Sequence, residues 1–175
     1  MLRQVILICI ALMAMSYSAN SQQSPPNSEK AKQIETLVHK AAVMVEKEGT
    51  EAFIEFRKRG SEWWSGDTYL FAYDPNLNVL LNPAFPEREG KNMSGDKDKN
   101  GKAFHDEFMK VVKSRGSGWV DYWLPKPGQT QPSQKWSYVT AVKTDGGTGI
   151  IHRCGFLPRV KNDVTSALGQ KRTLG

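Results

Sequence analysis

The sequence predicts an α+β domain in which a long first helix packs on a five-stranded antiparallel sheet. One observation is an apolar stripe between Ala31 and Val45, whose members recur at three- and four-residue steps. Another is a series of short aromatic or β-branched segments, separated by turn residues, over the rest of the chain. Because these helical and strand patterns are segregated rather than alternating, they favour antiparallel neighbours over a parallel sheet.

The first residues predict a secretory signal peptide over residues 1–21. Arg3 precedes an apolar run over residues 5–15, and a small, polar stretch over residues 16–21 follows, so we expect cleavage before Gln22. An uncleaved anchor is the alternative. The run is short for a membrane span, and no second hydrophobic segment follows. We therefore expect a periplasmic chain of one domain that is not stably inserted in the membrane after cleavage.

Composition limits the partners. The formal net charge is +6, and the basic residues are scattered singly rather than clustered in a stripe. This pattern suits attraction of small anions and predicts no nucleic-acid partner. Cys154 is the only cysteine after the signal segment, so no intramolecular disulfide is expected.

The expected elements follow from local signals. The first helix begins after Ser28 and ends near Gly49, and a shorter helix over residues 50–60 carries Phe53 and Phe56 inward. The expected strands cover residues 67–73, 79–81, 119–124, 135–142 and 148–155.

Between the second and third strands we expect a loop over residues 82–95 that folds over a site, and then a helix over residues 102–113. This helix buries a stripe made of Phe104, Phe108, Val111 and Val112. The domain spans residues 28–157, and residues 158–175 form a polar C-terminal tail.

The motifs do not indicate an enzyme, a metal site or a cofactor. The run from Asp96 to Glu107 fits the calcium-loop pattern of an EF-hand, but no helical pattern enters it, which favours a turn that caps the following helix. His39, His105 and His152 lie at no metal-ligand spacing. No nucleophile stands beside a base and an orienting group.

Several blocks occur in an order that resembles a known family. They cover residues 68–74, 89–92, 98–104, 118–127, 135–139 and 153–156. Together they resemble a single Cache domain of the second type, an extracytoplasmic sensor domain of bacteria, over about residues 30–157. The resemblance implies a PAS-like sheet behind a long N-terminal helix, with a small molecule, often a short carboxylate, on the open face. Family members commonly sit in chemoreceptors and histidine kinases, whereas we expect a free-standing module here that signals through a membrane partner.

A carboxylate ligand needs a fixed cation and hydroxyl donors in a poorly hydrated pocket with apolar walls. The candidate residues are Lys135 and, as a second cation, Arg153, the hydroxyls of Tyr122 and Tyr138, and the walls Phe71, Trp119 and Trp123. Asp121 offers an alternative in which the ligand carries an amine.

Strand parity limits this set. Lys135 and Tyr138 should face opposite ways, as should Tyr122 and Trp123, so only one parity set can line a pocket unless a bulge intervenes or Lys135 reaches around from the rim. Each aromatic side chain is alternatively an ordinary core residue. The alternative function is a structural or interaction protein that presents the same fold to an envelope partner without binding a ligand.

Overall fold

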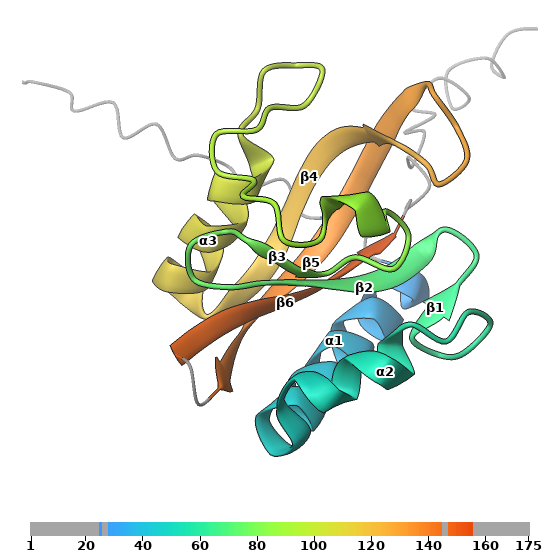
Figure 1. Cartoon of the computed structure of the whole chain (residues 1–175). Coiled ribbons are helices and arrows are strands. Elements are labelled where there is room, and N and C mark those ends of the chain that lie inside the picture. Colours follow the sequence, from blue (N-terminus) through green and yellow to red (C-terminus); the bar gives the residue numbers. More distant parts are fainter. Residues whose placement is uncertain (1–24, 26–27, 145–146, 156–175) are drawn as a thin grey trace, which may run out of the picture.

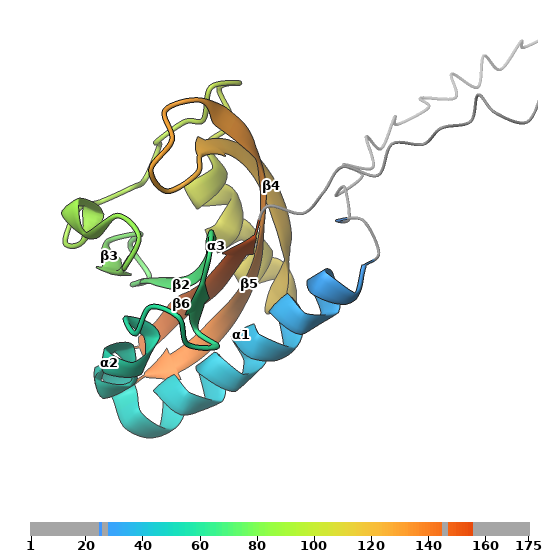
Figure 2. The same ribbon diagram turned by 90° about the vertical axis from the view of Figure 1, so that its right-hand side faces the viewer.

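The computed structural model describes residue 25, residues 28–144 and residues 147–155 (Figure 1). The expected signal peptide and the expected tail after residue 158 lie outside the described residues. Within the described part, a twisted antiparallel sheet separates helix α1 (Glu29–Glu48) on one face from helix α3 (Phe104–Arg115) on the other (Figures 1 and 2). The predicted α+β fold is confirmed.

Helix α1 has the predicted limits. The Ser28 hydroxyl accepts a hydrogen bond from the Ala31 amide at 3.2 Å, which satisfies one of the amides left open at a helix start. The helix ends before Gly49, whose φ of 64° is readily accessible to glycine. The side chains that it buries are Ala31, Ile34, Val38, Ala41, Ala42 and Val45.

The second helical segment is shorter than expected. A 3-10 turn η1 (Gly49–Ala52) leads into a single helical turn α2 (Phe53–Phe56), and residues 57–60 are not helical. Phe53 and Phe56 are nevertheless buried as predicted, and the Phe56 ring lies 4.9 Å from the ring of Trp63. The short segment is therefore fixed by the packing of Phe56 on Trp63, and a longer helix is not needed.

Six strands form within the described residues, one more than predicted. They are β1 (Trp64–Ser65), β2 (Thr68–Tyr73), β3 (Val79–Leu81), β4 (Ser117–Pro125), β5 (Pro132–Thr144) and β6 (Gly147–Gly155). The order is β1-β2-β6-β5-β4, with β3 paired to β2, and every pairing is antiparallel. The prediction missed β1 because a strand of two residues is too short to show an alternating pattern. Trp64 and Ser65 form a strand only by pairing with Tyr69 and Thr68 of β2.

The sheet has a core on each face. The α1 face contains Leu70, Ala72, Trp136, Tyr138 and Val142, packed against α1 and α2. The α3 face carries Tyr69, Phe71, Tyr73, Tyr122 and Val139, packed against the buried stripe of α3.

That stripe consists of Phe104, Phe108, Val111 and Val112, as predicted. The connection from β3 to α3, which includes the 3-10 turn η2 (Pro86–Arg88), runs on the same side of the sheet as α3 (Figures 1 and 2).

Candidate functional site

A buried lysine lies on the α3 face of the sheet. Lys135, on β5, is 1% exposed, and its Nζ atom donates a hydrogen bond of 3.0 Å to the hydroxyl of Tyr69 on β2. The same ammonium lies 4.6 Å from the centre of the Tyr69 ring and 6.0 Å from that of Phe71. Aromatic faces and phenolic oxygens attract cations, so these side chains help to hold a positive charge away from water.

Tyr122 forms the neighbouring wall. It stands opposite Lys135 in the β4–β5 register, and its ring centre lies 5.9 Å from the ammonium. Its hydroxyl shares a 2.7 Å hydrogen bond with Ser137, and its ring stacks on Phe104 of α3 with centres 4.3 Å apart. We call Tyr69, Phe71, Tyr122, Lys135 and Ser137 the Lys135 cluster.

The segment after β3 covers one end of this cluster. The Phe85 ring meets the Tyr69 ring edge-on at 6.3 Å, and the Arg88 guanidinium lies 5.4 Å from the centre of the Phe85 ring. This segment is the loop that the sequence predicts over a site. It brings the Phe85 ring onto Tyr69 and places the Arg88 guanidinium on that ring.

A two-pronged ion pair anchors the covering segment. Arg57 donates to both carboxylate oxygens of Glu89, at 2.7 and 2.8 Å, and Glu89 also accepts a hydrogen bond from the Asn82 amide at 2.7 Å. The hydrogen bond from Arg57, helped by the Asn82 amide, lowers the pKa of Glu89 against the opposing effect of burial. Glu89 thus joins the two ends of the segment over residues 82–89 to each other and connects them to Arg57, the residue directly after α2.

A buried histidine adjoins the cluster. His105, 2% exposed, shares a 2.9 Å hydrogen bond through Nδ1 with the hydroxyl of Tyr73, while Nε2 is buried without a hydrogen-bond partner among the described residues. Burial lowers its pKa from 6.5 to about 3, and the positive charge of Arg88 acts in the same direction, whereas Asp106 opposes them. The imidazole is therefore neutral at ordinary pH.

Three of the predicted ligand residues meet in this cluster, namely Lys135, Tyr122 and Phe71. Tyr138 and Trp119 lie on the α1 face, as parity requires once Lys135 is on the other face. The Tyr138 hydroxyl bonds to Ser117 at 2.9 Å and contacts His39 of α1 at 3.2 Å.

Trp119 donates from Nε1 to Glu35 of α1 at 2.6 Å. Trp123 is also apart from the cluster, since its ring lies 3.7 Å below the ammonium of Lys99. The structure therefore does not bring Trp119, Trp123 or Tyr138 to Lys135.

Two further expectations concern charged residues. Arg153 is in register with Leu70 and Tyr138, both on the α1 face, and its side chain lies outside the described part of the chain. Asp121, the alternative amine-binding residue, forms a 2.7 Å ion pair with Lys102. Of the two predicted cations, Lys135 is thus the one whose side chain the structure describes, and it lies among aromatic rings.

Sequence reasoning missed Tyr69, Ser137, Phe104 and His105. Parity offered a signal for two of them, because Tyr69 shares a face with Phe71 two residues on, and Ser137 shares one with Lys135. The other two are on α3, and no local pattern says which strand residues a helix will contact. Only the packing of α3 on the sheet brings Phe104 onto Tyr122.

Comparison with known proteins identifies the family. A family model described as "Cache domain" matches residues 13–146, which is more than half of the chain. The chain belongs to the Cache domain family. The resemblance inferred from the ordered sequence blocks is thereby confirmed.

Solved structures agree with this assignment. A periplasmic sensor domain of a chemotaxis protein is similar, with 28% identity and a TM-score of 0.65, covering 74% of this chain and 96% of that one. A Cache chemosensory domain described for carboxylic acid recognition has 26% identity and a TM-score of 0.61, covering 74% and 94%. A methyl-accepting chemotaxis protein from Vibrio parahaemolyticus, 18% identical with a TM-score of 0.58, covers 73% and 88% and shares the fold.

One curated relative also matches. The methyl-accepting chemotaxis protein McpP of Pseudomonas putida is 30% identical over 87 residues, which make up 48% of this chain and 16% of the receptor. These relatives are chemotaxis proteins and their sensor domains, which favours a sensor over an enzyme for this Cache domain.

The calcium-like loop of this Cache domain is used structurally. Asp98 accepts hydrogen bonds from the amides of Asn100 and Lys102 through one oxygen, at 2.8 and 3.0 Å, and from the Trp123 amide through the other, at 2.9 Å. The carboxylate therefore shapes the turn and fastens it to β4. Among the described residues, no three His, Cys, Asp or Glu side chains gather where they could hold a metal ion.

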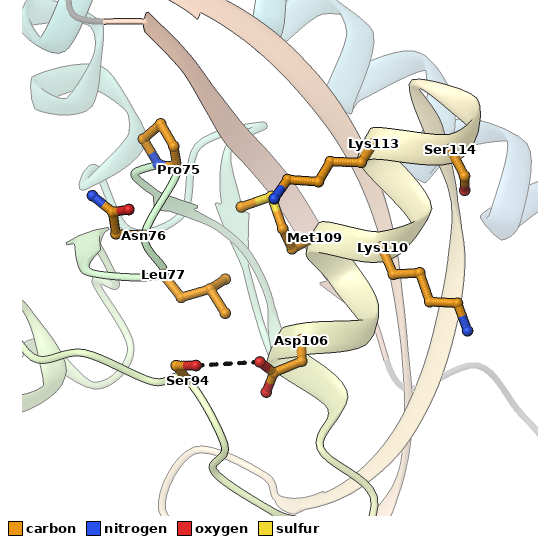
Figure 3. Close-up of a pocket in the computed structure, with 9 residues that line it drawn as sticks. All are labelled: Pro75, Asn76, Leu77, Ser94, Asp106, Met109, Lys110, Lys113 and Ser114. Carbon is orange, nitrogen blue, oxygen red and sulfur yellow. Dashed lines mark hydrogen bonds between the residues drawn. The ribbon is translucent and has the colours of Figure 1, made fainter.

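A groove of about 680 Å³ lies apart from the Lys135 cluster, between the β2–β3 turn and the outer side of α3 (Figure 3). None of the residues predicted to bind a ligand lines it. In the part of the chain that the structure describes, none of the helices has the length and apolar character needed to cross a membrane.

Proposed function

We propose that this Cache domain is an extracytoplasmic sensor module that binds a small carboxylate at the Lys135 cluster. The observation that carries the proposal is the buried ammonium of Lys135, which donates a hydrogen bond to the Tyr69 hydroxyl and lies near the rings of Tyr69 and Tyr122. Where water is excluded, an ammonium and a carboxylate attract each other far more strongly than in solution. The similarity to a Cache domain that recognises carboxylic acids supports the same ligand class.

Entry to this site requires the covering segment to move. Lys135 and Tyr122 are each 1% exposed, so a ligand reaches them only when Phe85 and its neighbours lift from Tyr69. The ion pair between Arg57 and Glu89 favours the closed position. A carboxylate that binds only the closed form then shifts the population toward closure, which is a signal that a partner can detect.

Strand β5 offers a route from the ligand to α1. It carries Lys135 on the α3 face and Tyr138 on the α1 face, where Tyr138 contacts His39 of α1. A shift of β5 on ligand binding therefore displaces contacts of α1. We propose that α1 transmits the signal to a membrane partner and that the apolar run over residues 5–15 directs export to the periplasm.

Thermal unfolding with a panel of acids tests the ligand class. Acetate, propionate and pyruvate are compared with the neutral propionamide, and a ligand present at a hundred times its Kd adds about 2.7 kcal/mol of stability. Lys135→Met should abolish the response to acids. The matched variant Tyr138→Phe, on the opposite face of the same strand, should retain it.

Two outcomes would contradict the proposal. Equal stabilisation by propionate and propionamide would show that no cation reads the carboxylate. If no acid stabilises the protein and Lys135→Met only changes its unfolding temperature, the cluster is structural. The domain would then serve as an interaction protein without a small ligand.

A further inference from the structure

The groove between the β2–β3 turn and α3 has opposite charges at its two ends. Asp106 and Lys113 both line it, and they are seven residues apart on α3, which places them on the same side of the helix about 10 Å apart along its axis. Figure 3 shows Asp106 at the end near Ser94 and the Lys113 side chain reaching over the other end toward Pro75. The groove is therefore negative at one end and positive at the other.

The acidic end is built into the fold. One oxygen of Asp106 accepts a hydrogen bond from the Gly95 amide at 2.8 Å, and the other accepts one from the Ser94 hydroxyl at 3.3 Å. These contacts fix the carboxylate at the mouth of the groove. A carboxylate has lone pairs for about four hydrogen bonds, so it can accept further donors from a ligand.

The basic end is accessible. Lys113 is exposed, and no ion pair involves it in the described part of the chain. Lys110 lines the groove one turn earlier, but Figure 3 shows its side chain directed away, and its ammonium lies 3.7 Å from Glu107. Lys113 is thus the cation positioned to meet a ligand.

The middle of the groove is apolar. Met109 projects from α3 between the two charged residues, and Leu77 faces it from the turn (Figure 3). Leu77 has a φ of 66°, a left-handed conformation that a leucine rarely adopts. Methionine adapts its shape to different apolar partners, so this pair can accept more than one side chain.

We propose that this groove binds a short zwitterionic peptide of about three residues. An extended chain spans about 3.3 Å per residue, so three residues match the distance of about 10 Å between the charged positions. The peptide's amino group contacts Asp106, its central apolar side chain packs on Met109 beside the buried Leu77, and its carboxylate contacts Lys113. The volume of about 680 Å³ falls within the range of small-ligand sites.

Nuclear magnetic resonance of the isotope-labelled full chain tests this proposal, with alanyl-leucyl-alanine as the probe. Titration should shift the amide signals of Leu77, Met109 and Lys113. The peptide with an acetylated amino end and an amidated carboxyl end should bind more weakly, by up to about 25-fold, because each of the two exposed charge pairs contributes up to about fivefold.

Two variants locate the contact. Lys113→Gln should weaken binding of the probe about fivefold and should bind the probe and its C-terminal amide equally. Lys47→Gln, a matched change at an exposed lysine in the last turn of α1, should leave the Kd unchanged. Lys135→Met should also leave it unchanged, which separates this groove from the proposed carboxylate site.

Three results would overturn the proposal. The first is the absence of any signal shift at the groove with probe at up to about 10 mM, which is on the order of the weakest useful affinities. The second is a set of shifts that map to another surface. The third is equal affinity for the free and capped peptides. Because Lys113 is exposed on a helix, its substitution leaves the fold intact, and circular dichroism checks this directly.

Discussion

Lys135 donates a hydrogen bond to the hydroxyl of Tyr69, although a strand that carries neither residue lies between their two strands. Lys135 is on β5 and Tyr69 is on β2, and β6 lies between these strands in the sheet. The two side chains therefore meet above β6, on the α3 face. This bond joins residues 66 positions apart and ties both halves of the sheet to one buried charge.

The hydrogen bond to a buried charge should contribute more stability than a neutral bond in the same cluster. Tyr69→Phe removes a hydrogen-bond acceptor of the Lys135 ammonium and should lower the free energy of unfolding by about 2 kcal/mol. Tyr122→Phe removes a neutral bond to Ser137 and should cost about 1 kcal/mol. Urea unfolding measures both, and equal losses would show that the ammonium does not depend on Tyr69.

The buried histidine should make stability depend on pH in a mildly acidic range. The pKa of His105 is lowered from 6.5 to about 3 by burial, with Arg88 acting in the same direction and Asp106 against it. Because the unfolded chain binds the proton and the folded chain does not, stability is fully present above pH 6.5 and is lost as pH falls toward about 3. The slope approaches about 1.4 kcal/mol per pH unit.

The variant His105→Phe isolates this effect. Between about pH 5.5 and 6.5 the carboxyl of Glu89, whose pKa is lowered from 4.5 on folding, is almost fully ionised in both the folded and the unfolded chain, so it adds little slope there. In that window His105→Phe should flatten the pH dependence of the unfolding free energy. An unchanged slope would mean that His105 is protonated equally in both states.

Loss of the Glu89 anchor should loosen the segment over the Lys135 cluster. Glu89→Gln breaks the two-pronged pair with Arg57 and should cost about 1 kcal/mol, because both partners are partly exposed. Hydrogen exchange should accelerate at the Asn82 amide, which bonds to Glu89, and at the Gly90 amide, which ties the end of this segment to the Val79 carbonyl of β3.

The exposed pair Lys40–Glu62 provides the control for this change. Glu62→Gln removes an exposed charge contact with Lys40 that involves no residue of the covering segment, and it should leave exchange of the Asn82 and Gly90 amides unchanged. Lowering the pH through the folded pKa of Glu89, which lies below 4.5, should reproduce the effect of Glu89→Gln, because the carboxyl then loses its negative charge. Unaltered exchange in Glu89→Gln would show that the ion pair with Arg57 does not hold the segment.

The end of α3 depends on a glycine. Gly116 has a φ of 78° and donates its amide to the Val112 carbonyl at 2.9 Å. Gly116→Ala should cost about 1 kcal/mol from backbone strain alone, because an added Cβ would meet nothing within 4 Å. Gly116→Asn should cost about as much, since the ψ of −34° at this position lies outside the left-handed helical region that asparagine tolerates, and thermal unfolding of the two variants measures both losses.

Local patterns were enough to predict α1, the buried stripe of α3 and most strands. Ser28 marks the start of α1 and Gly49 marks its end. Both signals can be read from the sequence because an N-cap and a residue with positive φ affect only the adjacent turn of the helix. Alternation along β5 placed Lys135 and Tyr138 on opposite faces, since side-chain direction in a strand is set within the strand itself. Strand β1 escaped prediction because it exists only through its pairing with β2.

The sequence by itself determined which residues could form a ligand site and which of them could not share a face. It also carried the ordered blocks that indicate a Cache domain. The tertiary structure alone decided that Lys135 meets Tyr69 across β6 and that Phe104 stacks on Tyr122. These contacts join segments far apart in the chain, and their geometry follows from how strands order in the sheet and how α3 packs on it. No local preference encodes that arrangement, because it depends on burying both faces of the sheet at once.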